Sequence, residues 1–505
     1  MKTCPVKSAR WLVVLFLTFF SSVFAQDVRL ERDDWAPDVK KALNDLLTTC
    51  GTSSPAYDRN AYAVFDFDNT TAIFDVEEQL IVYQLETMAF AIEPGALKEI
   101  LLTGLSDPDA DLSSYGHMNG SYDDLFDDVV DAYSRLWDKY GPFTPQGVSR
   151  DVLTELHSDP LWLEFAAKMR LSYDLVCDVE DNSVAYPWII YWFAGMSERE
   201  VYAMARRSCE KYGETETSRI LWESPKEIES RVGQVRVEWT SGVSVSANMK
   251  ELWKALRANG IDVWVCSASA TDAIIAAIDA WGMHDDCNGV LAMTAVLDEQ
   301  GRYCNAYDYE TGVGYYSMPG GEWKKMTRPE KTQTEGEGKV VAIVNAIAPE
   351  YEGRGPIAGF MDSSGDFNFC TEFKSLKLAV CFNRATRKPT CGGGLVAEIA
   401  LYERDVLGYD LAKANAAGDV LYLLQGRDEN RFRSFRPSSA TTRVGADRET
   451  LLATDANRAQ LELFVKEKTT VRDALNVYAL KRKAEDNAFG APSGFLDEYA
   501  GYRSR

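Results

Sequence analysis

Histidine is scarce in this sequence. The chain of 505 residues contains three histidines, His117, His157 and His284, and none of them lies at the spacing found on a zinc-protease helix. Multi-histidine metal chemistry and a histidine-based catalytic triad are therefore not expected. We expect any catalysis to depend on carboxylates instead.

Basic residues are outnumbered by acidic ones. Lysine and arginine together number 54, against 77 aspartates and glutamates, which gives a formal net charge of -23. Such a surface repels the phosphates of DNA and RNA, so we expect no nucleic-acid partner, although a local basic pocket is compatible with this charge. The hydrophobic share of 46% and charged share of 26% exclude a disordered or collagen-like chain. The sequence therefore predicts a folded protein with a large core.

Long hydrophobic runs are missing except near the start. Lys2, Lys7 and Arg10 precede the apolar stretch 11–20, and small residues follow up to Ala25. This pattern predicts a secretory signal peptide over residues 1–25, and the apolar stretch is shorter than the roughly 20 residues that span a bilayer. We expect an exported protein, periplasmic or secreted, with no stable membrane anchor after cleavage.

Cysteines are present in sufficient number for disulfides, which export would permit. Cys266 lies in an apolar strand-like run and is expected to be a free buried thiol. Cys177 with Cys209, and Cys287 with Cys304, are the pairings that we suggest, although spacing alone does not determine connectivity.

Short apolar runs alternate with helical patterns in much of the chain. The runs 61–68, 261–267 and 357–362 each end in small or acidic residues, and 378–382 is a further strand candidate. Helical periodicity precedes two of them, at 249–256 and 340–347. The alternation predicts an α/β fold with a Rossmann-like, doubly wound parallel sheet.

A long segment interrupts this alternation. Residues 74–240 have mostly helical patterns rich in tryptophan, tyrosine and acidic residues, which predicts a helical cap inserted into the core. We therefore assign 26–73 and 241–432 to the core. Residues 433–505 are expected to form a C-terminal, mostly helical extension, with a helical pattern at 458–466.

Two aspartates follow the first predicted strand. Asp66 and Asp68 lie where that strand changes into a loop, at the end of a parallel sheet where ligands bind. At this spacing one carboxylate can attack a substrate while the other exchanges protons. Asp107 and Asp109 have the same spacing without a preceding strand, so the context carries the prediction and the spacing alone does not.

These residues resemble the first motif, DxDx[TV], of the haloacid dehalogenase superfamily of phosphotransferases. The other three motifs of that superfamily follow in the expected order, at Ser267, at Lys339 and at Asp362 with Asp366. Lys331 is the alternative for the motif-three lysine. The fourth motif departs from its usual Gly-Asp opening, because Met361 precedes Asp362 here.

The resemblance implies a role for each motif residue. Asp66 would be the nucleophile and Asp68 the general acid and base, while Ser267 and Lys339 would bind and neutralise the phosphoryl group.

A magnesium site is also implied by the resemblance. Asp66, Asp68 through its carbonyl oxygen, and Asp362 would bind Mg²⁺, with Asp366 beside them, because this ion prefers hard oxygen ligands.

Within the superfamily the chain is most similar to the secreted phosphorylcholine phosphatase group. The segment 66–78 carries this resemblance, which extends to residues 424–429 and implies that Glu78 holds a quaternary ammonium group. The densest aromatic cluster is a candidate choline cage, and its alternative is the packing of a cap helix. The cluster residues assigned to substrate binding are Tyr186, Trp188, Tyr191 and Trp192.

The expected function is a Mg²⁺-dependent phosphomonoesterase that acts on phosphocholine or a similar small phosphate ester. Two alternatives remain open: a broad-specificity acid or phosphoserine-type phosphatase of the same fold, and a non-catalytic exported choline-binding protein. The oligomeric state is not predicted.

Overall fold

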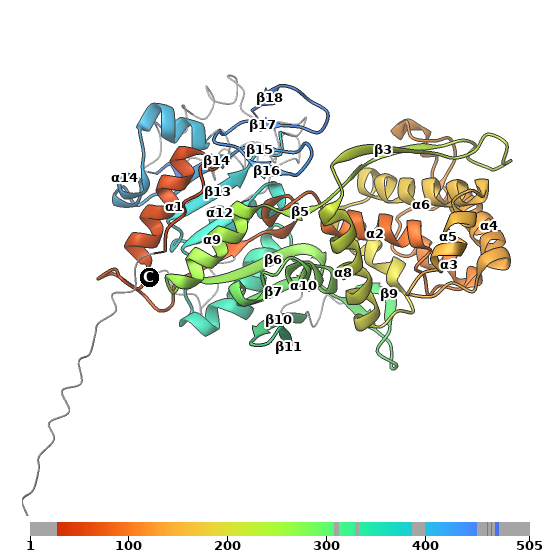
Figure 1. Cartoon of the computed structure of the whole chain (residues 1–505), viewed down its shortest axis with the longest axis horizontal. Coiled ribbons are helices and arrows are strands. Elements are labelled where there is room, and N and C mark those ends of the chain that lie inside the picture. Colours follow the sequence, from red (N-terminus) through yellow and green to blue (C-terminus); the bar gives the residue numbers. More distant parts are fainter. Residues whose placement is uncertain are drawn as a thin grey trace, which may run out of the picture.

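The computed structural model consists of a part built around a sheet and a part built of helices (Figure 1). It describes residues 28–307, 313–328, 333–385, 399–451, 462, 466 and 470–473. The predicted signal peptide, Lys331 and most of the predicted helix at 458–466 lie outside these residues.

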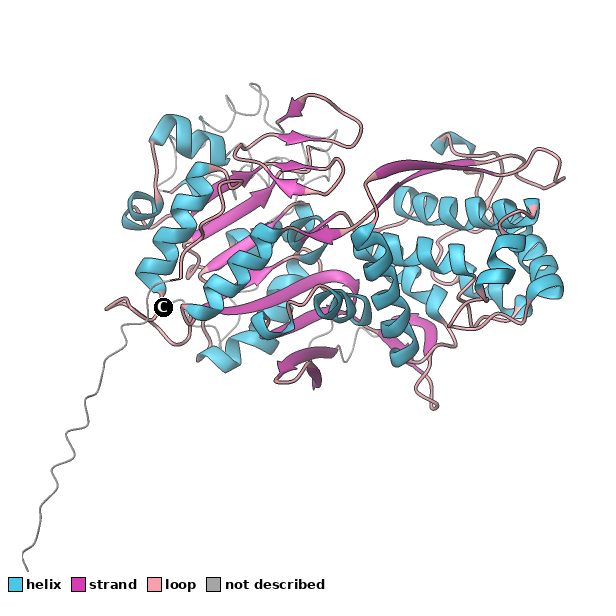
Figure 2. Cartoon of the chain, viewed as in Figure 1, coloured by secondary structure: helices cyan, strands magenta, loops and turns pink. Residues whose placement is uncertain are grey.

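The central sheet has eight strands, whose magenta arrows stand among helices in Figure 2. Strands β7, β6, β1, β12, β13 and β14 are parallel neighbours, while β10 and β11 add an antiparallel edge. Numbered along the chain, the parallel strands have the Rossmann order 3-2-1-4-5-6. The predicted fold class is confirmed. In spatial order the strands are β11 (Glu322–Thr327), β10 (Val313–Met318), β7 (Gly289–Met293), β6 (Asp262–Ala270), β1 (Tyr62–Phe65), β12 (Ala358–Met361), β13 (Leu378–Phe382) and β14 (Leu421–Gln425).

Helices cover both faces of this sheet, which explains why its strands are apolar without clean alternation. Phe65 packs on Trp253 from one face, with ring centroids 5.4 Å apart, while Val64 belongs to the apolar cluster of the other face with Val340. Ser246 accepts a hydrogen bond from the Met249 N–H group and so caps the helix that carries Trp253. The covering helices are α1 (Pro37–Cys50), α9 (Ala247–Ala258), α10 (Thr271–Ala280), α11 (Glu337–Ala342), η5 (Ile343–Ile347), η6 (Ala348–Tyr351), α12 (Phe367–Thr371) and α14 (Leu411–Ala416).

The helical part follows β1 and lies to the right in Figure 1. It also contains a hairpin of β3 (Ser218–Glu223) and β4 (Arg236–Ser241) that the sequence did not indicate. The chain enters and leaves through two short paired strands, β2 (Ala72–Ile73) and β5 (Ser244–Val245). Its helices are α2 (Val76–Thr87), α3 (Pro94–Leu102), η2 (Ser113–Tyr115), α4 (Tyr122–Tyr140), α5 (Arg150–Leu156), α6 (Pro160–Val179), α7 (Asn182–Ile190), η3 (Tyr191–Phe193) and α8 (Glu198–Glu214).

The predicted C-terminal extension begins with a small sheet, in a stretch rich in arginine, serine and threonine. Backbone pairing joins it to residues before 433, because the Arg427–Asp428 strand pairs with two later strands. The mostly helical character expected for 433–505 stays a prediction, because most residues after 451 lie outside those that the structure describes. The four strands are β15 (Arg427–Asp428), β16 (Ser434–Phe435), β17 (Thr441–Thr442) and β18 (Glu449–Thr450). The remaining short elements are η1 (Phe67–Thr71), η4 (His284–Asp286), β8 (Ala295–Leu297), β9 (Tyr303–Tyr307), η7 (Ser364–Asp366) and η8 (Glu403–Leu407).

The suggested disulfides do not form. Cys177, Cys209, Cys287 and Cys304 are all free thiols, and Cys266 is free and buried as predicted. Cys287 donates to the Gly289 carbonyl and Cys304 to the Arg302 carbonyl, so their sulfur atoms have separate partners. Cys177 is exposed whereas Cys209 is buried. Spacing in sequence did not indicate these different surroundings.

Across the part of the chain that the structure describes, no helix combines the length and apolar character needed to cross a membrane.

Candidate active site

A cavity of about 480 Å³ lies at the carboxyl ends of the central strands, facing the helical part. Asp66 directly follows β1 and Asp362 directly follows β12, the neighbouring strands where the chain order of the sheet reverses. Open α/β sheets bind ligands at this point, because the connections on either side diverge there and leave a crevice. Ser267 in β6 and Arg384 just after β13 complete this side of the cavity.

A buried lysine connects two of the acidic groups. The Nζ atom of Lys339 lies 2.6 Å from Asp66 Oδ1 and 2.5 Å from Asp366 Oδ1. Burial opposes the charge of Lys339, but Asp366 and Asp66 raise its pKa well above the usual value. Burial also raises the pKa of Asp66, and the Lys339 charge opposes that rise. Lys339 therefore occupies the position predicted for the motif-three lysine.

Three carboxylates form a possible metal site. One oxygen from each of Asp66, Asp362 and Asp366 lies within 4.8 Å of the others, and all three residues are buried. Burial raises the pKa of Asp366 to about 6, with the Asp66 charge contributing. This clustering of hard oxygen donors fits Mg²⁺, whose charge would offset the repulsion among the carboxylates.

The side chain of Asp68 faces away from this cluster. Its Oδ1 accepts a 2.6 Å hydrogen bond from the Val76 N–H group at the start of α2, and its Oδ2 accepts one of 2.6 Å from the Ser269 hydroxyl. Burial raises the pKa of Asp68 to about 7, although both hydrogen bonds favour the ionised form. A carboxyl group with this pKa can both give and take a proton near neutral pH. The carboxylate of Asp68 is therefore engaged away from the metal cluster. The carbonyl oxygen of Asp68 is the atom that we predict as a metal ligand.

Ser267 is buried at the cavity wall beside Asp66 and Lys339. Its hydroxyl oxygen accepts a 3.2 Å hydrogen bond from the Ser269 N–H group, and its carbonyl accepts one from Thr334. Among the described residues, none accepts a hydrogen bond from the Ser267 hydroxyl, so its proton can be donated to a ligand.

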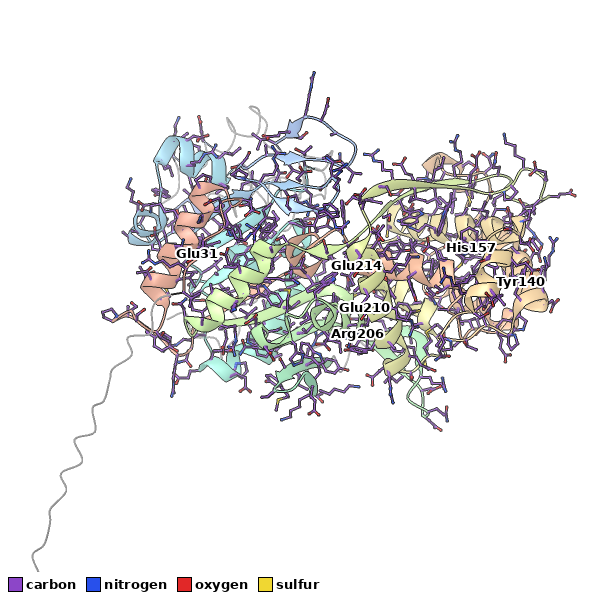
Figure 3. All side chains as sticks on the ribbon, viewed as in Figure 1. Glu31, Tyr140, His157, Arg206, Glu210 and Glu214 are labelled. Carbon is purple, nitrogen blue, oxygen red and sulfur yellow. The ribbon has the colours of Figure 1, made fainter. Side chains whose placement is uncertain are left out.

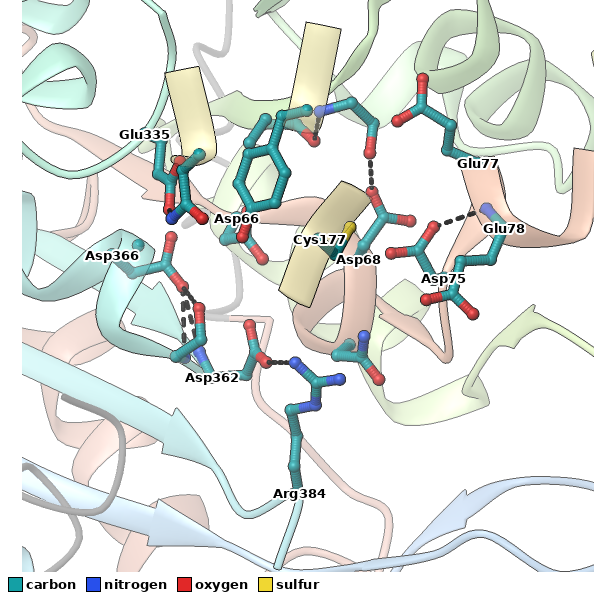
Figure 4. Close-up of a pocket in the computed structure, with 18 of the residues that line it drawn as sticks. Asp66, Asp68, Asp75, Glu77, Glu78, Cys177, Glu335, Asp362, Asp366 and Arg384 are labelled. Carbon is teal, nitrogen blue, oxygen red and sulfur yellow. Dashed lines mark hydrogen bonds and ion pairs between the residues drawn. The ribbon is translucent and has the colours of Figure 1, made fainter. Parts of the chain in front are cut away.

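The opposite wall, nearer the helical part, is also acidic. Figure 4 shows Asp68 between the Asp66, Asp362 and Asp366 cluster and a second group formed by Asp75, Glu77 and Glu78. Burial raises the pKa values of Asp75 and Glu77 well above normal. The other wall residues come mainly from α6 and α7, and they are Tyr173, Asp174, Cys177, Asp178, Asn182 and Tyr186.

Two arginines partly balance this charge. Arg170 approaches Glu78 at 3.5 Å and Asp174 at 2.5 Å, and its guanidinium group lies 5.6 Å from the ring centre of Tyr173. Arg384 donates to Asp362 Oδ2 at 3.1 Å, as the dashed line in Figure 4 shows. The wall around Glu78 remains rich in carboxylates and aromatic rings.

The predicted aromatic cage is only partly present. Tyr186 lines the cavity, but Trp188, Tyr191 and Trp192 do not. Trp188 is fully buried, donates to the Leu101 carbonyl at 2.8 Å and packs edge-on against Trp192. Trp188 lies in the buried second half of α7, and Tyr191 and Trp192 lie buried in the following η3, so the packing alternative is correct for these three residues.

Sequence reasoning missed several cavity residues. Ser269 stands in the same strand as Ser267, and Arg384 follows the predicted strand 378–382, so both positions carried a signal at a strand end. Tyr173 and Asp174 lie in the middle of α6, where only the packing of that helix brings them to the cavity.

The three histidines occupy different places. His117 lines the outer cavity and contacts Asp178 at 3.0 Å. His157 lies among the outer helices (Figure 3), and His284 bonds to Asp279.

No family model matches the chain, but other comparisons do. It is similar to a phosphorylcholine phosphatase of Pseudomonas aeruginosa, with 23% identity over 286 residues that cover 56% of this chain and 61% of that relative. The chain thus matches about three fifths of the length of its curated relative.

A solved structure shares the fold. A protein of unknown function from Anaerococcus prevotii matches with a TM-score of 0.64 and 24% identity, over 82% of this chain and 99% of that one. Cytosolic 5'-nucleotidase IIIB matches with a TM-score of only 0.29 and 11% identity, over 70% of this chain and 82% of that one. The relative in sequence is a phosphatase, which agrees with the predicted resemblance to haloacid dehalogenase superfamily phosphatases.

Proposed function

We propose that the chain is an exported, Mg²⁺-dependent phosphomonoesterase that acts through an aspartyl-phosphate intermediate on phosphocholine or a similar small ester with a cationic leaving group. The observation that carries this proposal is the placement of Asp68. On one side of Asp68 lie Lys339 and Asp66, which can bind and attack a phosphoryl group. On the other side lies the acidic and aromatic cavity wall around Glu78.

The first half-reaction needs a nucleophile and a proton donor. An oxygen of Asp66 attacks phosphorus, the bond from phosphorus to the leaving oxygen breaks, and Asp68 gives its proton to that oxygen. In the second half-reaction water attacks phosphorus, Asp68 takes a proton from the water, and the bond from phosphorus to Asp66 breaks.

The phosphoryl group is held by charge and hydrogen bonding. Lys339 supplies a buried positive charge, and the free hydroxyl proton of Ser267 can reach a phosphoryl oxygen. Asp66, Asp362 and Asp366 would hold Mg²⁺. When bound, this ion neutralises charge on the transferring group.

The leaving group would face the opposite wall. Glu78 supplies negative charge there, and Tyr173 and Tyr186 supply ring faces, which together favour an ammonium group. The carboxylate of phosphoserine would meet the same negative charges, so this wall favours phosphocholine over the phosphoserine alternative.

Export rests on the sequence pattern at residues 1–25. The periplasm or the exterior is proposed from that pattern alone.

Phosphate release tests the proposal. The chain 26–505 is assayed with phosphocholine, phosphoserine and p-nitrophenyl phosphate, in Mg²⁺ and in EDTA, beside Asp66→Asn. A matched control is Asp107→Asn, which alters the exposed pair with the same spacing.

The account expects Mg²⁺-dependent turnover that Asp66→Asn abolishes and Asp107→Asn retains, with phosphocholine preferred. Turnover of p-nitrophenyl phosphate without a preference for phosphocholine would favour the broad-specificity alternative. A folded chain that binds choline and hydrolyses none of the three esters would favour the binding-protein alternative.

A further inference from the structure

The loop that carries the catalytic aspartates has an unusual backbone. Asn69 has a φ angle of 61° and Phe74 one of 75°, so two non-glycine residues lie in the left-handed region. The Asn69 N–H group donates to the Phe74 carbonyl at 3.1 Å and closes the loop between them. Such conformations are costly, above all for a bulky residue such as Phe74, and persist only where surrounding contacts fix them.

A buried arginine supplies those contacts. Arg427 in β15 donates from Nη1 to the Asn69 carbonyl at 2.7 Å and from Nη2 to Asn69 Oδ1 at 3.1 Å. Its guanidinium group also lies 5.9 Å from the ring centre of Phe74. Arg427 thus contacts both left-handed residues, and it does so from a segment more than 350 residues away in sequence.

The arginine is itself held in place. Glu429 Oε1 accepts from Arg427 Nε at 2.9 Å and from Nη2 at 2.7 Å, and both residues are buried. The planar guanidinium group of Arg427 thus donates to two oxygen atoms of Asn69 and to the carboxylate of Glu429, and these contacts fix its orientation.

The far end of the segment is anchored as well. Arg433 donates to Ser244 Oγ at 2.9 Å, to the Thr215 carbonyl at 2.9 Å and to the Gly213 carbonyl at 3.1 Å. Ser244 belongs to β5, which pairs with β2 between Asn69 and the helical part. Residues 427–433, which we name the C-terminal brace, therefore contact both the catalytic loop and the strand through which the chain leaves the helical part.

We propose that the C-terminal brace is a positioning element for catalysis, in which Arg427 acts through Asn69 to fix the general acid and base Asp68. The proposal rests on the proposed function. Asp68 directly precedes Asn69, and its carboxyl group must stay within hydrogen-bonding reach of both the leaving oxygen and the attacking water. A displacement of about 1 Å at such a group can lower the rate about 100-fold.

The test combines two substitutions with kinetics. Arg427→Lys keeps the positive charge but cannot donate to both the carbonyl oxygen and Oδ1 of Asn69 in the same way. Asn69→Gly removes the Oδ1 acceptor, and glycine tolerates the positive φ angle at this position. We expect each to lower kcat for p-nitrophenyl phosphate by about 10- to 100-fold with little change in KM. The double variant should lose much less than the product of the two single losses, because both act on one contact.

Arg404→Lys is the matched control. Arg404 donates to Ser439 Oγ at 3.1 Å beside the same small sheet and pairs with Asp405, and within the described residues it contacts neither the catalytic loop nor residues 427–433. It should retain the wild-type kcat. Hydrogen exchange of amides 67–76 gives a readout independent of turnover, and it should rise in Arg427→Lys and stay unchanged in the control variant.

Two failures are distinguishable. An active wild type whose kcat and loop exchange are unchanged by Arg427→Lys would overturn the role of the brace and leave the phosphatase proposal standing. Independent losses that multiply in the double variant would also overturn it. A wild type without turnover would overturn the proposed function and with it any catalytic role for Arg427.

Discussion

Lys339 forms ion pairs with two of the motif carboxylates. It is buried, touches Asp66 and Asp366, and carries the one motif charge that is positive. The same contacts that would neutralise a phosphoryl group also compensate the carboxylates in the absence of a ligand. Stability and catalysis therefore depend on the same side chain.

Lys339→Gln should lower both the free energy of unfolding and the rate of phosphate release. Removing one partner of a buried ion pair leaves uncompensated charge, at a cost of about 3–5 kcal/mol in the free energy of unfolding. Urea unfolding in EDTA measures this loss, and added Mg²⁺ should restore part of it.

Lys325→Gln is the control for that substitution. Lys325 forms an ion pair of 2.5 Å with Glu198 at the surface, with 45% of its side chain exposed, so about 0–1 kcal/mol is expected. Equal losses in the two variants would contradict the special role of Lys339.

Asp272 gives a pH-dependent prediction outside the catalytic cluster. Burial raises its pKa to about 7, although a hydrogen bond from Tyr303 opposes the rise. The folded state therefore holds this proton more tightly than the unfolded state, whose carboxyl titrates near its ordinary value of about 3.9. The contribution of Asp272 to stability is highest below about pH 4 and falls by up to about 1.4 kcal/mol per pH unit as pH rises to about 7.

Asp272→Asn should remove this slope. The free energy of unfolding of the wild type minus that of the variant, measured between pH 4 and pH 8, should fall with pH and level off above about 7. The exposed Asp285→Asn should keep the wild-type profile. A difference that is constant with pH would contradict the assignment.

At the scale of elements, helix α7 contributes to the core and to the cavity wall from different positions. Trp188 is fully buried against Leu101 and Trp192, whereas Tyr186, two residues earlier, is half-buried at the cavity. Trp188→Ala should cost about 3–5 kcal/mol of stability through the space it leaves. Tyr186→Ala should instead raise KM for phosphocholine. Thermal unfolding and steady-state kinetics on both variants separate the two roles, and a reversed pattern would contradict the placement of the helix.

The first turn of α2 carries Glu78, to which the proposed function assigns the selectivity for the leaving group. Glu78 is 42% exposed in its side chain and faces the cavity, so it can approach a cation without a full desolvation penalty. Glu78→Gln should raise KM for phosphocholine about tenfold, equal to about 1.4 kcal/mol, and leave KM for p-nitrophenyl phosphate nearly unchanged. Glu99→Gln, on the exposed side of α3, is the control. An equal rise for both substrates would place Glu78 outside the leaving-group site.

The predictable elements are those whose signal is local. Asp66, Ser267 and Asp362 stand at or near the ends of apolar strands, and parallel pairing then brings these ends together. Arg427 and Asp174 carry no such signal, because long-range packing alone places them. Trp188 was assigned wrongly because aromatic density does not reveal which face of a helix is covered.

At the scale of the whole molecule, the net charge is strongly negative, but the active-site cavity also contains positive side chains. The net charge of -23 would oppose an anionic substrate, yet Lys339 and Arg384 both line the active-site cavity. Residues at the strand ends of the sheet line one side of this cavity, and residues of the helical part line the other (Figure 4). In the proposed function the first side holds the phosphoryl group and the second faces the leaving group. The two parts meet at Asp68, which would exchange a proton with both.

The central claim is that Asp66 becomes phosphorylated during turnover. The direct measurement is rapid quenching of the chain with p-nitrophenyl phosphate and Mg²⁺, reduction of any acyl phosphate with borohydride, and peptide mass spectrometry. Borohydride converts a phosphorylated aspartate to homoserine. The account predicts homoserine at position 66, none at 68, and none in Asp66→Asn. Turnover with homoserine at another aspartate, or with none at all, would contradict it.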